Sequence, residues 1–225
     1  MKKKILITAA CLAAVCIAAL SYLYLFSSRP VRIACVGDSI TWGAYLEKRS
    51  RECYPARLQQ YLGKTFLVKN FGVNSATVQK SGDKPYWEQD AFLNSAAFAP
   101  DVVFLMLGTN DTKTQNRQGL SQFRQDYTDM IDYYLSLSSH PRVYILTPPP
   151  IFSLEGDGTV RFAMHPDTLL QEITVMKEVA AEKKLPVIDI YRKLSGQSQY
   201  FTLDGVHPDR EGADVIAQTV YRNFK

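Results

Sequence analysis

The chain has 225 residues, of which 46% are hydrophobic, enough apolar material for one domain of ordinary size but not for two. Its formal net charge is +4, but Lys2, Lys3 and Lys4 are the only charged residues before Arg29, so the rest of the chain is close to neutral. This balance gives no electrostatic basis for binding nucleic acid, and none is expected as a partner.

An uncharged and largely apolar segment, residues 5–26, directly follows the three lysines. As a helix it would cross a hydrocarbon core of about 30 Å, and it is longer than the apolar stretch of about 7 to 15 residues in a secretory signal. We therefore predict an N-terminal membrane anchor or signal segment at residues 1–28 and one domain at residues 29–225. The positive-inside rule places this domain on the outer side of the cell membrane. A cleaved signal, which would leave a secreted protein, is the alternative.

Five short apolar runs alternate with longer segments of helical period, which is typical of a parallel sheet with crossover helices. Pro55 opens one helical segment that Gly63 ends, and residues 121–137 carry a single apolar stripe. Residues 166–184 and 211–224 show the same pattern. The sequence therefore predicts an α/β fold, a three-layer α/β/α sandwich around a five-stranded parallel sheet. The expected strands are residues 31–36, 66–70, 102–107, 143–147 and 187–190.

Ser39 follows the first predicted strand directly, behind Gly37 and Asp38. In an open parallel sheet the functional groups gather beyond the carboxyl ends of the strands. A serine at this point would expose its hydroxyl at the edge of the sheet, beside backbone N–H groups. The alternative is that Asp38 or Ser39 only caps a helix.

Two further loops are expected at the same edge of the sheet. The second predicted strand leads to Gly72 and the third to Asn110, both in strings rich in turn-forming residues. Each loop alone would mean little, because any turn uses such residues. Together they would bring a peptide N–H and a side-chain amide close to Ser39.

A serine needs a base to act as a nucleophile, and the chain has three histidines, His140, His165 and His207. His207 is distinguished by Asp204, a carboxylate three residues ahead, and by Gly205, which permits a tight turn between them. Such a loop can let the carboxylate accept the Nδ1 hydrogen of the imidazole, so that Nε2 is free to take the proton of the serine. The alternative is a local Asp–His pair on the surface.

Four strings in the chain together resemble the ordered sequence blocks of the SGNH or GDSL hydrolase family. Their order and spacing cover nearly all of the predicted domain, and chance agreement of four blocks is improbable. The strings are GDSITWG at 37–43, NFGVNSAT at 70–77, LGTND at 107–111 and DGVHP at 204–208.

The resemblance implies a flavodoxin-like fold and a serine esterase that works through an acyl-enzyme, without a metal or another cofactor. It implies that Ser39 attacks an ester carbonyl while His207 acts as general base and then as acid, oriented by Asp204. It also implies an oxyanion hole formed by the backbone N–H of Ser39, the backbone N–H of Gly72 and the side-chain amide of Asn110.

The substrate is less well defined by the sequence. Trp42, Tyr86 and Trp87 are candidates for an aromatic rim that would suit a sugar ring, although such residues often belong to a core instead. The chain is similar in pattern to bacterial family members that remove acetyl groups from carbohydrates, which implies an acetylated glycan or another small ester as substrate. The alternatives are a lysophospholipase or thioesterase, a glycan O-acetyltransferase, and a non-catalytic glycan-binding module.

Overall fold

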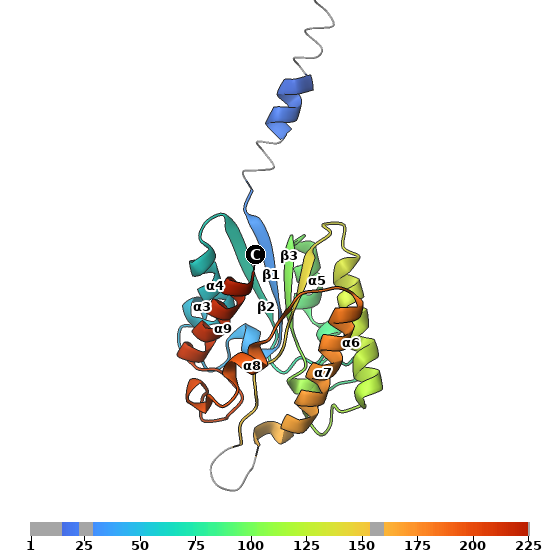
Figure 1. Ribbon diagram of the computed structural model, residues 1–225, viewed down its shortest axis with the longest axis vertical. Helices are drawn as coiled ribbons and strands as arrows, with labels where there is room; N and C mark the ends of the chain where they lie inside the picture. The colour runs from blue at the N-terminus through green and yellow to red at the C-terminus, as the bar shows by residue number, and fades with distance from the viewer. Residues whose placement is uncertain (1–14, 23–28, 154–159, 225) are drawn as a thin grey trace, which may run out of the picture.

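The computed structural model describes residues 15–22, 29–153 and 160–224. In this part of the chain, five strands form one sheet in the order β2-β1-β3-β4-β5, and every neighbouring pair is parallel (Figure 1). This is the strand order of flavodoxin-like folds, so the predicted fold is confirmed. The strands are β1 (Val31–Gly37), β2 (Phe66–Gly72), β3 (Val102–Met106), β4 (Arg142–Leu146) and β5 (Val187–Ile188).

The helices cover both faces of the sheet, because side chains alternate between the two faces along each strand. In β1, Ala34 and Val36 pack against α5, α6 and α7, whereas Ile33 and Cys35 pack against α4, α8 and α9. Two separate apolar cores result, which makes the three layers of the sandwich. The helices are α2 (Ser39–Trp42), α3 (Arg49–Glu52), α4 (Tyr54–Leu62), α5 (Asp90–Ala97), α6 (Leu120–Leu135), α7 (Pro166–Glu182), α8 (Ile190–Leu194) and α9 (Arg210–Asn223).

The last strand is shorter than predicted. β5 contains only two residues, because Asp189 caps the start of α8 by accepting a hydrogen bond from the backbone N–H of Arg192 at 3.0 Å. The hydroxyl of Thr147 also donates to the Asp189 carboxylate, at 3.0 Å. The polar cap therefore ends the strand where the apolar pattern of the sequence suggested that it continued.

The predicted N-terminal anchor, residues 5–26, lies largely outside the described residues. Residues 15–22 within it are helical, with exposed side chains. Among the ranges that the structure describes, no helix combines the length and the apolar character needed to span a bilayer.

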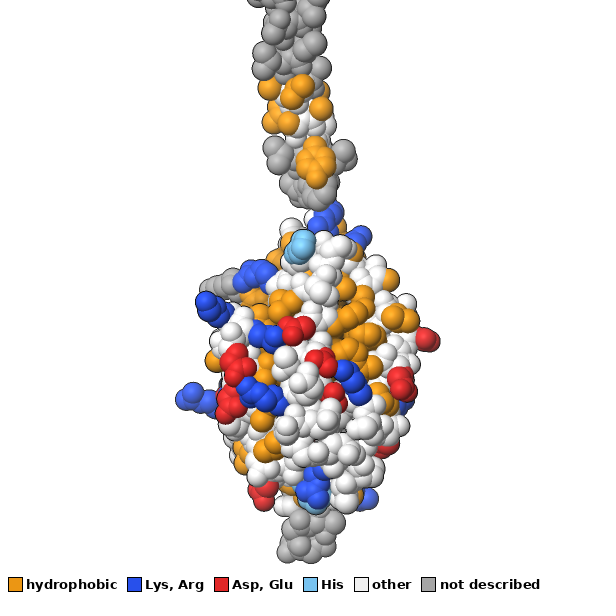
Figure 2. All heavy atoms as spheres, turned by 90° about the vertical axis from the view of Figure 1, so that its right-hand side faces the viewer, with side chains coloured by type: hydrophobic (Ala, Val, Ile, Leu, Met, Phe, Trp, Pro, Cys, Tyr) orange, Lys and Arg blue, Asp and Glu red, His pale blue; other side chains and the backbone are white. Residues whose placement is uncertain are grey.

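The face that carries α6 and α7 shows basic and acidic side chains interspersed (Figure 2). Arg124 of α6 contacts Glu178 of α7 at 2.9 Å, and Lys183, which directly follows α7, contacts Asp132 of α6 at 2.5 Å. Exposed pairs of this kind contribute little to stability, typically below about 1 kcal/mol each. Their alternation keeps this face free of a large patch of one charge.

Candidate active site

Ser39 lies at the carboxyl end of β1 because α2 begins without a connecting loop. A side chain at Gly37 would place its Cβ 2.0 Å from the Oγ1 atom of Thr41, so only glycine allows the helix to begin so close to the strand. The carboxylate of Asp38 caps α2 by accepting the backbone N–H of Ile40 at 2.9 Å. Because Asp38 is the cap, the hydroxyl of Ser39 is left for other contacts.

The Ser39 hydroxyl meets the ring of His207, 168 residues further along the chain, with 2.8 Å between Oγ and Nε2. The other ring nitrogen, Nδ1, lies 2.6 Å from the Oδ2 atom of Asp204. Ser39 is 9% exposed and His207 is 6% exposed, so both are sheltered but still reach the surface of a cavity. The three predicted residues therefore form one continuous chain of hydrogen bonds.

The loop that carries Asp204 and His207 fixes the carboxylate tightly. The Oδ1 atom of Asp204 accepts the backbone N–H groups of Val206 at 2.8 Å and His207 at 2.9 Å, and the hydroxyl of Thr202 at 2.8 Å. Burial by itself would raise the pKa of Asp204, but the hydrogen bonds that it accepts outweigh burial and hold its pKa well below the usual value. Gly205, with φ at +71°, provides the left-handed turn that closes the loop. The carboxylate is thus held in its charged form next to the imidazole.

Two hydrogen-bond donors line the same cavity without a partner. Asn110 is 2% exposed, and one of its amide hydrogens is donated to the carbonyl of Ala76 at 3.2 Å. Within the described ranges, neither its second amide hydrogen nor the backbone N–H of Ser39 has an acceptor. Buried donors are normally paired, so these two are available to a ligand.

Gly72 does not supply a third donor, so the prediction that its backbone N–H belongs to the oxyanion hole is wrong. Its N–H is already donated to the Oδ1 atom of Asn70 at 2.8 Å, and Gly72 does not line the cavity. The glycine serves close packing instead, because a Cβ there would lie 2.2 Å from the backbone nitrogen of Trp42.

Ser75, three residues further on, occupies the position that was expected for Gly72. It lines the cavity, and its backbone N–H has no acceptor in the described part of the chain. The N–H of Ala76 donates to the carbonyl of Val73 at 3.2 Å and closes a tight turn that holds Ser75 at φ +65°. A non-glycine residue in this left-handed region is uncommon and is found mainly where the surroundings require it.

Substitution of Ser75 can test whether its backbone or its side chain matters. We expect Ser75→Gly to keep the N–H in place, to remove the left-handed strain and to retain activity within a few-fold. Ser75→Val places a β-branched side chain at positive φ, and we expect it to lower stability by about 1–3 kcal/mol. Thermal denaturation and kcat for 4-nitrophenyl acetate measure the two effects. A hundredfold loss of kcat in Ser75→Gly would show that the hydroxyl, not the N–H, is needed.

The cavity that contains these groups has a volume of about 320 Å³. Trp42 lines it as predicted, and the guanidinium of Arg49 covers the indole ring at 4.3 Å. Tyr45 and Phe162 also line it, with ring centroids 4.9 Å and 6.0 Å from that of His207. A larger groove of about 540 Å³, between α3, α4 and α9, contains none of these groups.

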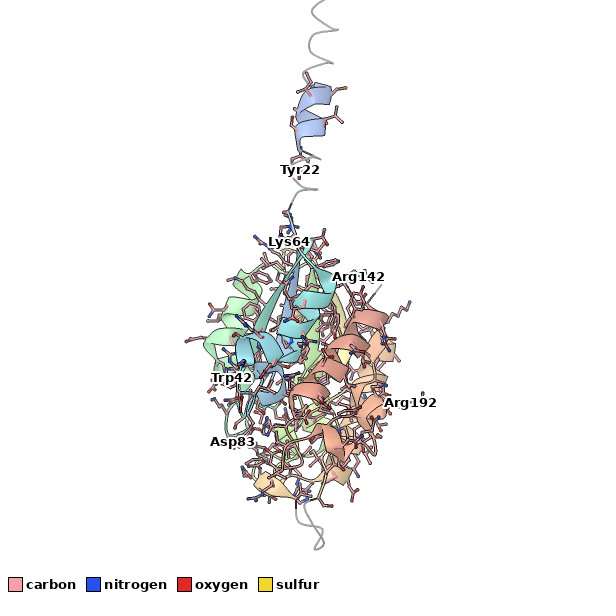
Figure 3. The ribbon with its side chains drawn as sticks, turned by 90° about the vertical axis from the view of Figure 1, so that its left-hand side faces the viewer. Tyr22, Trp42, Lys64, Asp83, Arg142 and Arg192 are labelled. Carbon is pink, nitrogen blue, oxygen red and sulfur yellow. The ribbon has the colours of Figure 1, made fainter. Side chains whose placement is uncertain are left out.

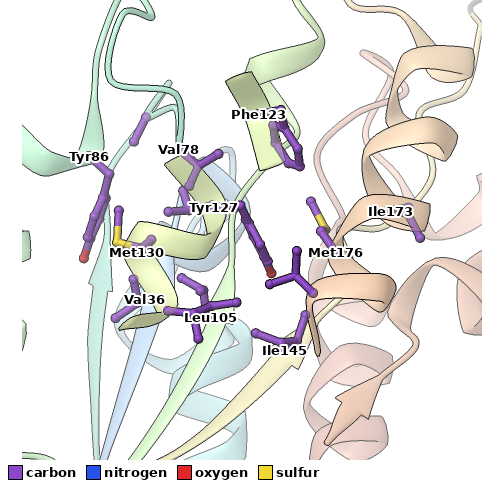
Figure 4. Packing of buried hydrophobic residues seen from close by; sticks show 14 of the residues in the cluster. Val36, Val78, Tyr86, Leu105, Phe123, Tyr127, Met130, Ile145, Ile173 and Met176 are labelled. Atoms are coloured by element: carbon purple, nitrogen blue, oxygen red, sulfur yellow. The ribbon is translucent and has the colours of Figure 1, made fainter. Parts of the chain in front are cut away.

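Tyr86 and Trp87 do not line the cavity but belong to the core, which was the alternative to a place in the substrate rim. Tyr86 is fully buried within the core beside α6 (Figure 4), and its hydroxyl donates to the carbonyl of Phe71 at 2.7 Å. The indole N–H of Trp87 donates to the carbonyl of Val78 at 2.9 Å, and its ring packs against the same core. Because both polar atoms find backbone acceptors, Tyr86 can be fully buried and Trp87 partly buried.

Asp38 adds a second acidic group beneath the cavity. It is 1% exposed, and burial raises its pKa to about 6, although the N–H of Ile40 and the charges of His207 and Lys113 act in the opposite direction. The described residues include no group of three or more metal-ligating side chains that could hold an ion. The site itself brings together a serine hydroxyl, an imidazole and a carboxylate.

Comparison with known proteins agrees with this geometry. The model of the family described as GDSL-like lipase/acylhydrolase matches residues 35–215. An acetylxylan esterase from Xylanibacter ruminicola is 33% identical over 212 residues, which are 87% of this chain and 43% of that protein. The chain thus spans less than half the length of this relative.

Solved structures share the fold at low sequence identity. An aryl esterase from M. smegmatis superposes with a TM-score of 0.69 at 21% identity, over 85% of this chain and 96% of that chain. A carbohydrate acetylesterase from Sinorhizobium meliloti gives a TM-score of 0.70 at 19% identity, with the same two coverages of 85% and 96%. The chain belongs to the GDSL-like lipase/acylhydrolase family.

Proposed function

We propose that this protein is a serine esterase that removes acetyl groups from a carbohydrate through an acyl-enzyme. The observation that carries the proposal is the chain of hydrogen bonds from Ser39 through His207 to Asp204, which ends in a cavity with unpaired donors. A serine, a base and an orienting group within hydrogen-bond distance are the arrangement that nucleophilic catalysis requires.

In the proposed reaction, the Oγ atom of Ser39 attacks the ester carbonyl carbon as its proton passes to Nε2 of His207. The carbonyl oxygen gains negative charge, which the N–H groups of Ser39 and Ser75 and the amide of Asn110 stabilise. The imidazolium then gives its proton to the alcohol oxygen as the ester bond breaks. Water activated by the same imidazole hydrolyses the acyl-enzyme and restores the serine.

The role of Asn110 can be tested by Asn110→Ala. We expect kcat for 4-nitrophenyl acetate to fall by roughly 100- to 1000-fold, as the loss of one oxyanion donor typically does, with a smaller change in KM. Asn116→Ala is a control for structure, because Asn116 donates to the Asn110 carbonyl at 2.9 Å and supports the same loop. A loss in Asn110→Ala no larger than in Asn116→Ala would contradict direct stabilisation of charge.

Three observations support an acetylated carbohydrate as the substrate. The cavity of about 320 Å³ suits a short acyl group, and the half-buried ring of Trp42 offers an apolar face for a sugar. The curated relative is named an acetylxylan esterase. A screen of acetate release by the full-length chain against acetylated glycans tests the proposal. Absence of release from every glycan, with 4-nitrophenyl acetate still hydrolysed, would leave only a general esterase.

A longer acyl chain is the second candidate, and one feature favours it. A groove of about 470 Å³ adjoins the cavity, shares Tyr45 and Phe162 with it, and includes Leu203, which is 95% exposed. Such an apolar extension could hold an alkyl chain, as in a lysophospholipase or thioesterase. Comparison of 4-nitrophenyl acetate with the octanoate separates the two, since a strong preference for octanoate would exclude the acetylesterase.

We also propose that residues 5–26 attach the domain to the outer side of the cell membrane. The support is the uncharged apolar composition of this segment and the three lysines before it. Fractionation of cells that express the full-length chain, followed by carbonate extraction, tests the attachment. Recovery of the protein from the culture medium with its N-terminus at or beyond residue 20 would indicate a cleaved signal instead.

A further inference from the structure

Lys113 is a cation in the catalytic cavity that the proposed mechanism does not use. It lines the cavity together with Ser39 and His207, although it is only 8% exposed. Its backbone is fixed at the end of a short 3₁₀ turn, where its N–H donates to the carbonyl of Asn110 at 3.2 Å. The side chain therefore starts from a rigid point next to the predicted oxyanion donors.

No acidic side chain neutralises this ammonium at contact distance. Among residues 15–22, 29–153 and 160–224, none forms an ion pair or a side-chain hydrogen bond with Lys113. Asp38 is close enough for the two charges to influence each other, but it is 1% exposed and lies beyond ion-pair distance. An ammonium without a charged partner at the wall of a cavity favours an anion that can reach it.

The remaining lining of the cavity supplies no competing negative charge. Of its described lining residues, Lys113 alone carries a permanent charge, and the others are neutral, aromatic or aliphatic, apart from the imidazole of His207. An acetyl group is itself uncharged. A permanent negative charge on the bound substrate must therefore belong to the alcohol half of the ester.

We propose that Lys113 binds a carboxylate on the sugar that carries the acetyl group or on its neighbour, so that the preferred substrate is an acidic glycan. This inference rests on the proposed carbohydrate esterase function and names its substrate class. A charged hydrogen bond between ammonium and carboxylate would fix the sugar relative to Ser39 and add to binding.

The adjoining groove offers aromatic surface for further sugar rings. Tyr45 and Phe162, which are 66% and 43% exposed, separate the cavity of Lys113 from this groove and line both. Arg161, also exposed, and Asp204 line the groove as well. The two aromatic faces can stack on sugar rings, whereas the opposite charges of Arg161 and Asp204 give the groove no preference of its own for an anion.

Inhibition of 4-nitrophenyl acetate hydrolysis by simple sugars tests the proposal without an acetylated glycan. For the full-length chain we expect glucuronate to inhibit competitively, with an inhibition constant at least about tenfold lower than that of glucose. Lys113→Met should abolish this difference between the two sugars, whereas Lys113→Arg should retain most of it. Added salt should weaken inhibition by glucuronate but not by glucose.

Lys64→Met is the matched control, because it removes the same charge at the amino end of β2. Figure 3 shows Lys64 near the N-terminal end of the domain, far from Trp42 of the cavity. We expect Lys64→Met to keep the preference for glucuronate. Melting temperatures of the variants show whether each is folded.

The outcomes distinguish this inference from the proposed function. Equal inhibition by glucuronate and glucose, or an unchanged preference in Lys113→Met, overturns the role of Lys113. Acetate release from neutral glycans together with equal inhibition would support the esterase and reject the acidic substrate. Preference for glucuronate that depends on Lys113, without acetate release from any glycan, would support the anion site and reject the proposed acetylated substrate.

Discussion

Ser39→Ala should abolish ester hydrolysis, with kcat for 4-nitrophenyl acetate reduced at least about ten-thousand-fold. The substitution removes the hydroxyl that lies 2.8 Å from the Nε2 atom of His207. The fold should survive, because Asp38 rather than Ser39 caps α2 and the hydroxyl has no other side-chain partner among the described residues. The melting temperature should therefore remain within a few degrees of that of the parent protein.

A fluorophosphonate probe, which labels activated serines, provides an independent measurement. The parent protein should be labelled, and Ser39→Ala should not. Ser121→Ala, at the exposed first turn of α6, is a matched control that should be labelled as well as the parent. Undiminished hydrolysis or labelling in Ser39→Ala would show that another residue is the nucleophile.

Asp204→Asn should reduce kcat by roughly 10⁴-fold, although the side chain keeps its shape. The Oδ1 atom of Asp204 accepts three hydrogen bonds from the loop, so the amide oxygen of the variant would remain there. Its NH₂ group would then face Nδ1 of His207, which must become an acceptor. The ring proton moves to Nε2, and the imidazole can no longer take the proton of Ser39.

Asp209→Asn is a suitable control for this charge loss. Asp209 lies five residues away and caps α9 by accepting the N–H of Gly212 at 2.8 Å, a role that asparagine performs equally well. We expect its kcat to match that of the parent. If Asp204→Asn kept kcat within tenfold of the parent, the carboxylate would not set the tautomer of His207.

The order and place of the main elements could be predicted because apolar runs carry most of the signal for a buried parallel sheet. All five strands occur where apolar runs were found, and α4, α6, α7 and α9 follow helical periodicity closely. Helix α5 was not predicted, since an element as short as Asp90–Ala97 contains too few turns for a periodic pattern. The end of β5 could not be predicted, because it depends on a polar contact between Asp189 and Thr147 and the hydrophobic pattern contains no information on such contacts.

The site was predicted where a residue's chemistry decides its role, and missed where backbone conformation decides it. Ser39, Asp204 and His207 could be found because few residue types can form such a chain of proton transfer. Gly72 was assigned to the oxyanion hole from the family resemblance, but which N–H of this loop faces the cavity depends on backbone dihedrals such as the positive φ of Ser75. The useful signal was the turn-forming Asn-Ser pair in the string at 70–77.

Aromatic residues near the site show the same limit. The residue type alone does not show whether a tryptophan or tyrosine packs in a core or lines a cavity. The sequence therefore could not distinguish the role of Trp87 from that of Trp42. What differs is a buried carbonyl that accepts the indole N–H, as Val78 does for Trp87. Tyr45 and Phe162 were overlooked because neither belongs to a recognisable motif.

The short loop that holds Asp204 beside His207 also has a consequence for refolding. The N–H of Thr202 donates to the carbonyl of His207 at 2.8 Å, and the N–H of Gly205 donates to that of Thr202 at 3.0 Å. The acid–base pair can therefore form locally, whereas its meeting with Ser39 requires that the two ends of the domain come together. Recovery of activity after dilution from denaturant should thus follow the slowest long-range step, and regained helical signal without activity would mark molecules whose C-terminal segment has not yet docked.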